Sequence, residues 1–232
     1  MKFGSLMLTL GAAVTLAACA SPTSRFYTLA GDARPVPSAP ASFYFELAPV
    51  DMPQQVTRNQ LVVQTSPAQV QVLEENRWAS LPADEVRRAL SDDLTQQLGA
   101  IDVYNTPRPD SVPVYRVKVN VQRFESWPGS QAVIDAVWSV HTAGSSTVLT
   151  CRTVAQERVG PGYDALVDGH RKAVDELASA ISTGMRSLAS LPPAPTATAS
   201  ASPEKARTGA KTRPAPLLPC PAASATANVS EQ

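Results

Sequence analysis

The stretch Tyr115-Arg116-Val117-Lys118-Val119-Asn120-Val121-Gln122 alternates strictly between apolar and polar side chains. Alternation with a period of two places every second side chain on the same face of an extended chain. One apolar face and one charged face are typical of an antiparallel strand that covers a core on one side only. Residues 112–125 therefore predict a long, half-buried strand.

Further strands are expected on both sides of this one. A turn at Trp127-Pro128-Gly129-Ser130 leads into alternation over 132–140, and a second turn at 144–146 leads into a strand over 147–157. Together the three long strands predict an antiparallel meander. Short strands are expected earlier in the chain, at 43–50, 61–65, 70–73 and 101–104.

Two segments have the apolar period of a helix. Over 83–98 an apolar residue recurs every fourth position from Val86, with Pro82 suited to the first turn and Gly99 to the C-terminal cap. A longer helix is expected over 164–188, capped by Asp164. The sequence thus predicts an α+β fold: a mainly antiparallel sheet with two amphipathic helices packed on one face.

The N-terminus is typical of a signal peptide. Met1-Lys2-Phe3 precedes an uncharged, mostly apolar stretch over 4–16, too short for the roughly 20 residues of a membrane-spanning helix. It ends in Leu16-Ala17-Ala18-Cys19, which resembles the lipobox of bacterial lipoproteins. That resemblance implies cleavage before Cys19 and a covalent diacylglyceryl group and N-acyl chain on this cysteine. The alternative is an ordinary signal peptide with a chance cysteine.

The organisation expected from these patterns has four parts. Residues 1–18 are the signal peptide, 19–42 the lipidated N-terminus with a first strand and a connector, and 43–189 the folded domain. Residues 190–232 contain eight prolines and no aromatic residue. Such a composition cannot bury enough apolar surface to offset the entropy of ordering, so we expect this tail to be disordered.

Two cysteines remain, Cys151 in a predicted strand and Cys220 in the tail. An oxidising compartment allows them to pair. We nevertheless expect two free thiols, because a disordered tail provides no fixed geometry for a bond.

Charge and motifs argue against several classes of function. Without the signal peptide and the tail, which carries a net +2, the net charge is about −3, so there is no basic footprint for nucleic acid. His141, near a strand end, and His170, on the apolar stripe of the last helix, are expected to be structural. No metal-ligand spacing, nucleophile elbow, phosphate loop or dinucleotide fingerprint occurs. We therefore expect no enzyme and no cofactor or metal apart from the lipid.

Several segments, taken in order, resemble the ABC-type transport auxiliary lipoprotein family, which includes the PqiC-like lipoproteins. The match runs roughly from residue 19 to residue 188. The segments that carry it are Ser24–Leu29, Met52–Arg58, Asn76–Pro82, Val121–Glu125 and Ala136–Trp138.

This resemblance implies a non-catalytic component of an envelope transport system. Its partners would be an inner-membrane ABC permease and ATPase and an MCE-type periplasmic protein, and its cargo a phospholipid or another hydrophobic molecule moved between the inner and outer membranes. Ala20, where aspartate would favour the inner membrane, favours the outer membrane, with the domain facing the periplasm. Homo-oligomerisation is left open. The alternatives are a structural lipoprotein for outer-membrane assembly or cell-wall attachment, and an envelope hydrolase.

The segments that carry the resemblance also supply the candidate partner interface: Arg25, Phe26, Tyr27, Leu29, Arg58 and Trp78. Each has a plainer interpretation. Phe26, Tyr27 and Leu29 could form an edge strand that closes the core, and Trp78 could anchor the core beneath the start of the first helix. Arg58 could cap a helix end or meet an acidic partner.

Overall fold

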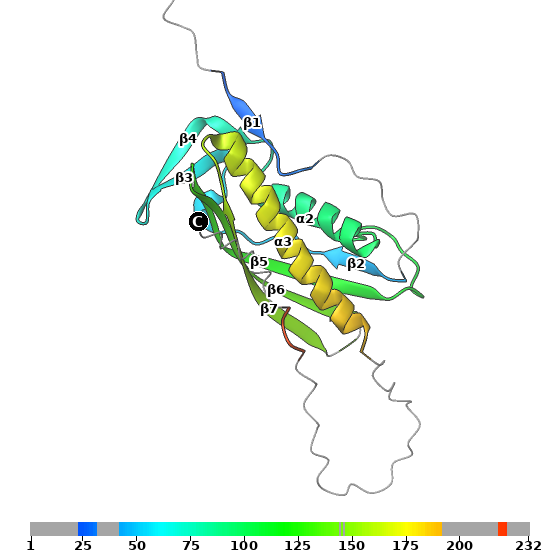
Figure 1. Cartoon of the computed structure of the whole chain (residues 1–232). Helices are drawn as coiled ribbons and strands as arrows, with labels where there is room; N and C mark the ends of the chain where they lie inside the picture. Colours follow the sequence, from blue (N-terminus) through cyan, green and yellow to red (C-terminus); the bar gives the residue numbers. More distant parts are fainter. Residues whose placement is uncertain (1–22, 32–41, 144, 146, 192–217, 222–232) are drawn as a thin grey trace, which may run out of the picture.

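The computed structural model describes residues 23–31, 42–143, 145, 147–191 and 218–221. They form two β-sheets and two long helices (Figure 1). The predicted signal peptide, Cys19, most of the connector and most of the tail lie outside the described residues. Within the described residues, none of the helices is long and apolar enough to cross a membrane.

The larger sheet has the strand order β2-β5-β6-β7. Its strands are β2 (Tyr44–Leu47), β5 (Val114–Trp127), β6 (Gln131–Thr142) and β7 (Val148–Arg158). The predicted meander is confirmed, because β5 pairs antiparallel with β6 and β6 with β7. A bulge between Val121 and Arg123 shifts the alternation of β5 by one residue, so Phe124 and Ser126 face the core beyond it.

The smaller sheet has the order β1-β4-β3. Its strands are β1 (Arg25–Tyr27), β3 (Gln60–Ser66) and β4 (Gln69–Trp78), and a short 3-10 helix, η2 (Gln54–Val56), precedes β3. The two short strands predicted on either side of Pro67 are confirmed, the second being longer than expected. β1 pairs parallel with β4, and β2 pairs parallel with β5, so both sheets are mixed.

The strand predicted over 101–104 is wrong: only an isolated bridge joins Asp102 to Phe45 there. The Asp102 carboxylate accepts hydrogen bonds from the backbone N–H groups of Leu47 (3.2 Å) and Tyr104 (3.0 Å). A short acidic side chain that binds nearby backbone donors in this way competes with a strand ladder.

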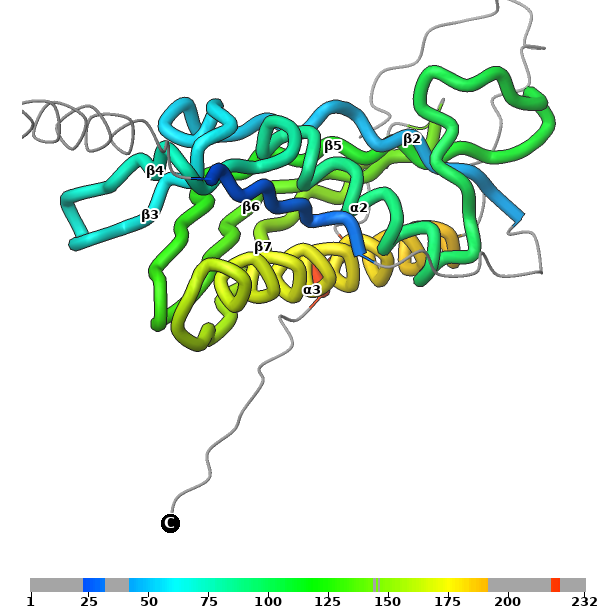
Figure 2. The backbone as a smooth tube through the Cα atoms, turned by 90° about the horizontal axis from the view of Figure 1, so that it is seen from above, coloured from blue at the N-terminus to red at the C-terminus, as the bar shows by residue number. Residues whose placement is uncertain are grey.

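The helices are α2 (Pro82–Leu98) and α3 (Tyr163–Ala189), and Figures 1 and 2 show them side by side, with α3 lying along β6 and β7. Gly99 ends α2 in the left-handed conformation (φ 65°), as predicted. The predicted cap of α3 is wrong. Gly162 occupies that position, and Asp164 lies inside the first turn, where its charge still suits the helix dipole.

The core lies between α3 and the inner face of the larger sheet. Trp138 of β6 is its largest fully buried side chain, and its indole N–H donates to Thr153 Oγ1 (2.9 Å) on β7. Gly184 of α3 lies directly above it: a Cβ there would come within 2.8 Å of Trp138 Cη2. The absence of a side chain at Gly184 thus lets the helix approach the sheet closely. The α+β class is confirmed.

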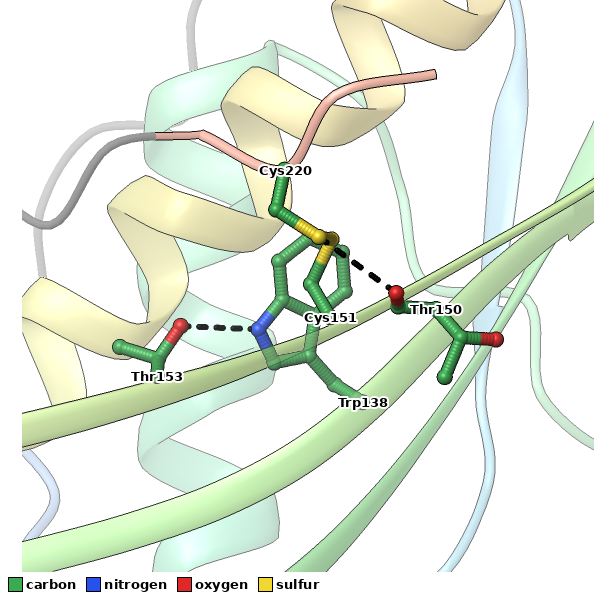
Figure 3. Close-up of a disulfide and its surroundings, with 5 residues drawn as sticks. All are labelled: Trp138, Thr150, Cys151, Thr153 and Cys220. Atoms are coloured by element: carbon green, nitrogen blue, oxygen red, sulfur yellow. Dashed lines mark hydrogen bonds between the residues drawn. A yellow bond between two sulfur atoms is a disulfide. The ribbon is translucent and has the colours of Figure 1, made fainter. Parts of the chain in front are cut away.

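The expectation of two free thiols is wrong, because Cys151 and Cys220 form a disulfide (Figure 3). Cys151 faces inward on the edge strand β7, and its Cα lies 5.6 Å from that of Cys220. Leu218, two residues before Cys220, is partly buried and packs against the core. Residues 218–221 therefore supply the fixed geometry that the composition of the tail does not suggest. Cys220 Sγ also contacts the Thr150 carbonyl oxygen at 3.4 Å, which is no hydrogen bond because a disulfide sulfur carries no hydrogen.

Candidate functional surface around strand β1

β1 lies at the outer edge of the smaller sheet, in dark blue at the upper end of the molecule in Figure 1. Phe26 is in register with Arg77, and Tyr27 with Trp78. Because successive side chains of a strand point to opposite faces, Tyr27 enters the core while Phe26 points away from it. Phe26 is 66% exposed, the highest fraction for any large apolar side chain among the described residues.

Three of the six candidate interface residues belong to the core. Tyr27, Leu29 and Trp78 are 8%, 2% and 3% exposed. The Tyr27 hydroxyl donates to Asn76 Oδ1 (3.1 Å), and the Trp78 ring makes an edge contact with the Phe124 ring at 6.0 Å between centroids. The plainer interpretations are confirmed for these residues: β1 is an edge strand that closes the core, and Trp78 is a core anchor.

The end of β1 is fixed by a carboxylate that was not among the residues predicted from the sequence. Glu85, in the first turn of α2, is 0% exposed. One of its oxygens accepts hydrogen bonds from the Leu29 N–H (2.8 Å) and the Thr28 hydroxyl (2.7 Å). The other accepts from the Ser80 N–H (3.1 Å) and the Ser80 hydroxyl. No sequence signal marks Glu85, because an acidic residue in the first turn of a helix is ordinarily exposed.

The charge of Glu85 is stabilised where it lies. Burial alone would raise the pKa of this carboxyl group. The hydrogen bonds from Ser80, Thr28 and Leu29, with the Arg88 guanidinium 3.7 Å away, outweigh burial and hold its pKa below the usual value. Glu85 is therefore an ionised acceptor that joins residues 28–29 to Ser80 and the first turn of α2.

A second link ties β1 to α3. Arg171 donates from Nη2 to the Thr28 carbonyl oxygen (2.8 Å) and from Nη1 to Asp168 (2.6 Å). Figure 2 shows the first described segment running from the small sheet toward the two helices. Residues 23–31 are thus fastened to β4, α2 and α3.

The remaining candidates, Arg25 and Arg58, are exposed. Among the described residues neither guanidinium has a hydrogen bond or ion pair. Arg58 follows η2, but Thr57 caps that helix through its N–H and its hydroxyl, both donated to Gln54 O. The neighbouring Asn59 O accepts from the Trp78 N–H (2.6 Å), so Arg58 lies on the side of β4 opposite β1. The six candidates therefore gather around the small sheet, and Arg25, Phe26 and Arg58 face solvent.

His170 pairs with a serine, as the base of a catalytic serine would. Its Nε2 lies 2.8 Å from Ser126 Oγ, its ring stacks on Phe124 at 4.1 Å, and burial lowers its pKa to about 3. Both members are closed to solvent (0% and 2% exposed), and His170 Nδ1 has no partner among the described residues. A nucleophile needs access to substrate, and its base needs an orienting group. The hydrogen bond between His170 and Ser126 is therefore a structural contact inside the core.

Comparison with known proteins assigns the domain to a family. The model of the ABC-type transport auxiliary lipoprotein component matches residues 27–182. The fold resembles a crystal structure of an uncharacterized protein, with 21% identity and a TM-score of 0.57 over 71% of this chain and 99% of the other. It also resembles protein XCC0632 from Xanthomonas campestris, a DUF330 protein, with 16% identity and a TM-score of 0.50 over 71% and 98%.

At these identities the two structures bear on the fold alone. Among curated proteins the comparison found no match. The family model spans the chain from β1 to the middle of α3, which is well over half of its length. The chain belongs to the ABC-type transport auxiliary lipoprotein family.

Proposed function

We propose that this chain is a lipid-anchored, non-catalytic component of an envelope ABC/MCE-type transport system. Its role is to hold a periplasmic assembly at the outer membrane while phospholipid or another hydrophobic molecule passes between the two membranes. The observation that carries the proposal is the family match over residues 27–182, which begins at the last residue of β1, extends into α3 and supports an auxiliary role in ABC-type transport.

The anchor in this proposal is Cys19, which carries the diacylglyceryl and N-acyl groups after cleavage. Leu16-Ala17-Ala18-Cys19 supports this assignment, and Ala20 supports the outer membrane. Several acyl chains hold a protein stably, whereas one chain binds reversibly. The anchor lies four residues before Thr23, where the described domain begins.

A non-catalytic role agrees with how the domain uses its buried polar groups. Glu85 fastens β1, and Asp135, 1% exposed, accepts two hydrogen bonds from Arg152 (2.8 and 2.6 Å). His170 is enclosed by aromatic rings. Among the described residues, no three His, Cys, Asp or Glu side chains gather as a metal site would require. These groups hold the fold together and leave binding as the natural role of its surface.

The partners proposed are an MCE-type periplasmic protein and the inner-membrane permease and ATPase. Arg58 supports a contact with a protein partner, since its guanidinium is exposed and has no hydrogen bond or ion pair among the described residues. An arginine in this state can bind a carboxylate of an acidic surface with two hydrogen bonds. Arg58→Glu should then reverse the attraction and weaken co-purification, while the domain stays folded.

The anchor and its membrane are tested by fractionation of cell envelopes. Cys19→Ala should leave the outer-membrane fraction and be found as precursor or as soluble protein, because the acyl chains hold it there. Ala20→Asp, the matched variant, keeps the lipid and should move to the inner membrane. Co-purification of the lipidated wild-type protein should recover permease, ATPase and MCE-type protein. Recovery of peptidoglycan in their place would favour the structural-lipoprotein alternative.

A further inference from the structure

Phe26 is an apolar aromatic side chain that is exposed to solvent. It is 66% exposed on the outer face of an edge strand, next to the exposed Arg25. Its neighbours on that face are polar: Arg77 lies in register with it, and Ser24 donates to Glu75 (2.9 Å). A lone apolar ring with a polar rim is small for a protein interface, which buries about 800 Å² on each partner. A single exposed aromatic ring among polar side chains is typical of residues that lie at the headgroup level of a bilayer.

The length of the chain before β1 limits where this ring can be. Seven residues separate Cys19 from Phe26, so their Cα atoms are at most about 25 Å apart in any conformation. β1 in turn cannot move independently of the domain, because Glu85 and Arg171 fasten the residues that follow it. An anchored domain therefore keeps the β1 end of the small sheet within about 25 Å of Cys19.

We propose that Phe26 contacts the phospholipid bilayer in which Cys19 is anchored. The Phe26 ring enters the interface between headgroups and acyl chains. This contact fixes the tilt of the domain on the membrane, which an acyl tether alone leaves free. The inference rests on the proposed lipidation of Cys19 and goes beyond it by assigning an orientation.

Ile101 provides a matched control on the same domain. It is 56% exposed, similar to Phe26, but follows the C-terminal end of α2. The first turn of α2 holds the end of β1 through Glu85. The 17 residues of α2 span about 25 Å, so Ile101, at the other end of this helix, lies far from the proposed membrane contact.

The test uses the lipidated full-length protein in phosphatidylethanolamine and phosphatidylglycerol vesicles, with and without brominated acyl chains, which quench tryptophan on contact. Phe26→Trp and Ile101→Trp are compared after subtraction of the wild-type signal from Trp78, Trp127 and Trp138. Circular dichroism first establishes that both variants fold. The tryptophan at position 26 should lose a large part of its added emission, and the one at position 101 almost none.

Flotation of the same vesicles tests the lipid anchor separately from the orientation of the domain. If the protein floats with the vesicles and position 26 is quenched no more than position 101, the orientation is wrong while the lipid anchor stands. If the wild-type protein does not float, the anchor fails and the inference fails with it. Emission at position 26 that shifts to the blue without bromine quenching would also overturn the inference, since the ring would then be covered by protein.

Discussion

Glu85→Gln should destabilise the domain although it preserves the shape of the side chain. The carboxylate accepts two backbone hydrogen bonds, one on each oxygen, from Leu29 and Ser80. Glutamine has one acceptor oxygen, so one of these buried N–H groups would face an amide NH₂. An unsatisfied buried donor costs about 1–3 kcal/mol, and the remaining bonds weaken when the acceptor loses its charge. We expect a loss of about 3 kcal/mol in the free energy of unfolding.

Asp84→Asn is the control, because Asp84 is the exposed acidic neighbour in the same helical turn. It should cost no more than the interaction with the helix dipole, about 0.3–1 kcal/mol. Both variants are measured by urea unfolding of the oxidised protein, followed by tryptophan fluorescence. Hydrogen exchange adds a local measurement: the Leu29 amide should lose protection in Glu85→Gln and keep it in Asp84→Asn.

The pH dependence of this difference has a definite sign. Because the pKa of Glu85 is lowered in the folded state, its contribution is present above the unfolded pKa, about 4.3, and is lost as the pH falls through the lower folded pKa. The difference between wild type and Glu85→Gln should thus be constant near neutral pH and shrink only in acid. Equal effects of the two variants at pH 7 would refute the role assigned to Glu85.

Three further predictions concern the disulfide and the two histidines. Cys220→Ser should lower the free energy of unfolding by about 4 kcal/mol, since the disulfide spans 69 residues. Reductant should destabilise the wild type in urea unfolding and leave this variant unchanged. His170→Gln should flatten the pH dependence of stability between about pH 4 and 6.5. The native ring stays neutral with a pKa of about 3, while the unfolded ring binds a proton near pH 6.5, so wild-type stability should fall by up to about 1.4 kcal/mol per pH unit on acidification. An equal slope in the variant would contradict this. A folded His141→Gln/His170→Gln double variant should still complement a deletion strain, because both histidines are expected to be structural.

The elements that could be predicted from the sequence are those whose pattern is long and local. The strand over 112–125 and the helix over 83–98 each repeat their period several times, so packing and periodicity agree. β1 and β2 have three and four residues, too few to show a period, and their parallel pairing joins distant segments. That is why a mainly antiparallel sheet was expected where both sheets are mixed.

The candidate surface was only partly predictable for the same reason. The segment Arg25-Phe26-Tyr27 marks a strand, but its length does not tell which residue faces the core. Register with Arg77 and Trp78 decides that Phe26 is exposed and Tyr27 buried. Glu85 and the Cys151–Cys220 disulfide depend on segments that are 56 and 69 residues apart in the chain, and no local pattern reports such contacts.

The disulfide also imposes an order of events on the newly made chain. Synthesis at 5–20 residues per second delivers Cys220 roughly 3–14 s after Cys151, because 69 residues separate them. The strands and α3 are complete by residue 189, before the second cysteine exists. The domain can therefore fold around an unpaired Cys151 on its edge strand. During that interval this inward-facing thiol has no partner within its own chain, and only the arrival of Cys220 allows the disulfide to form.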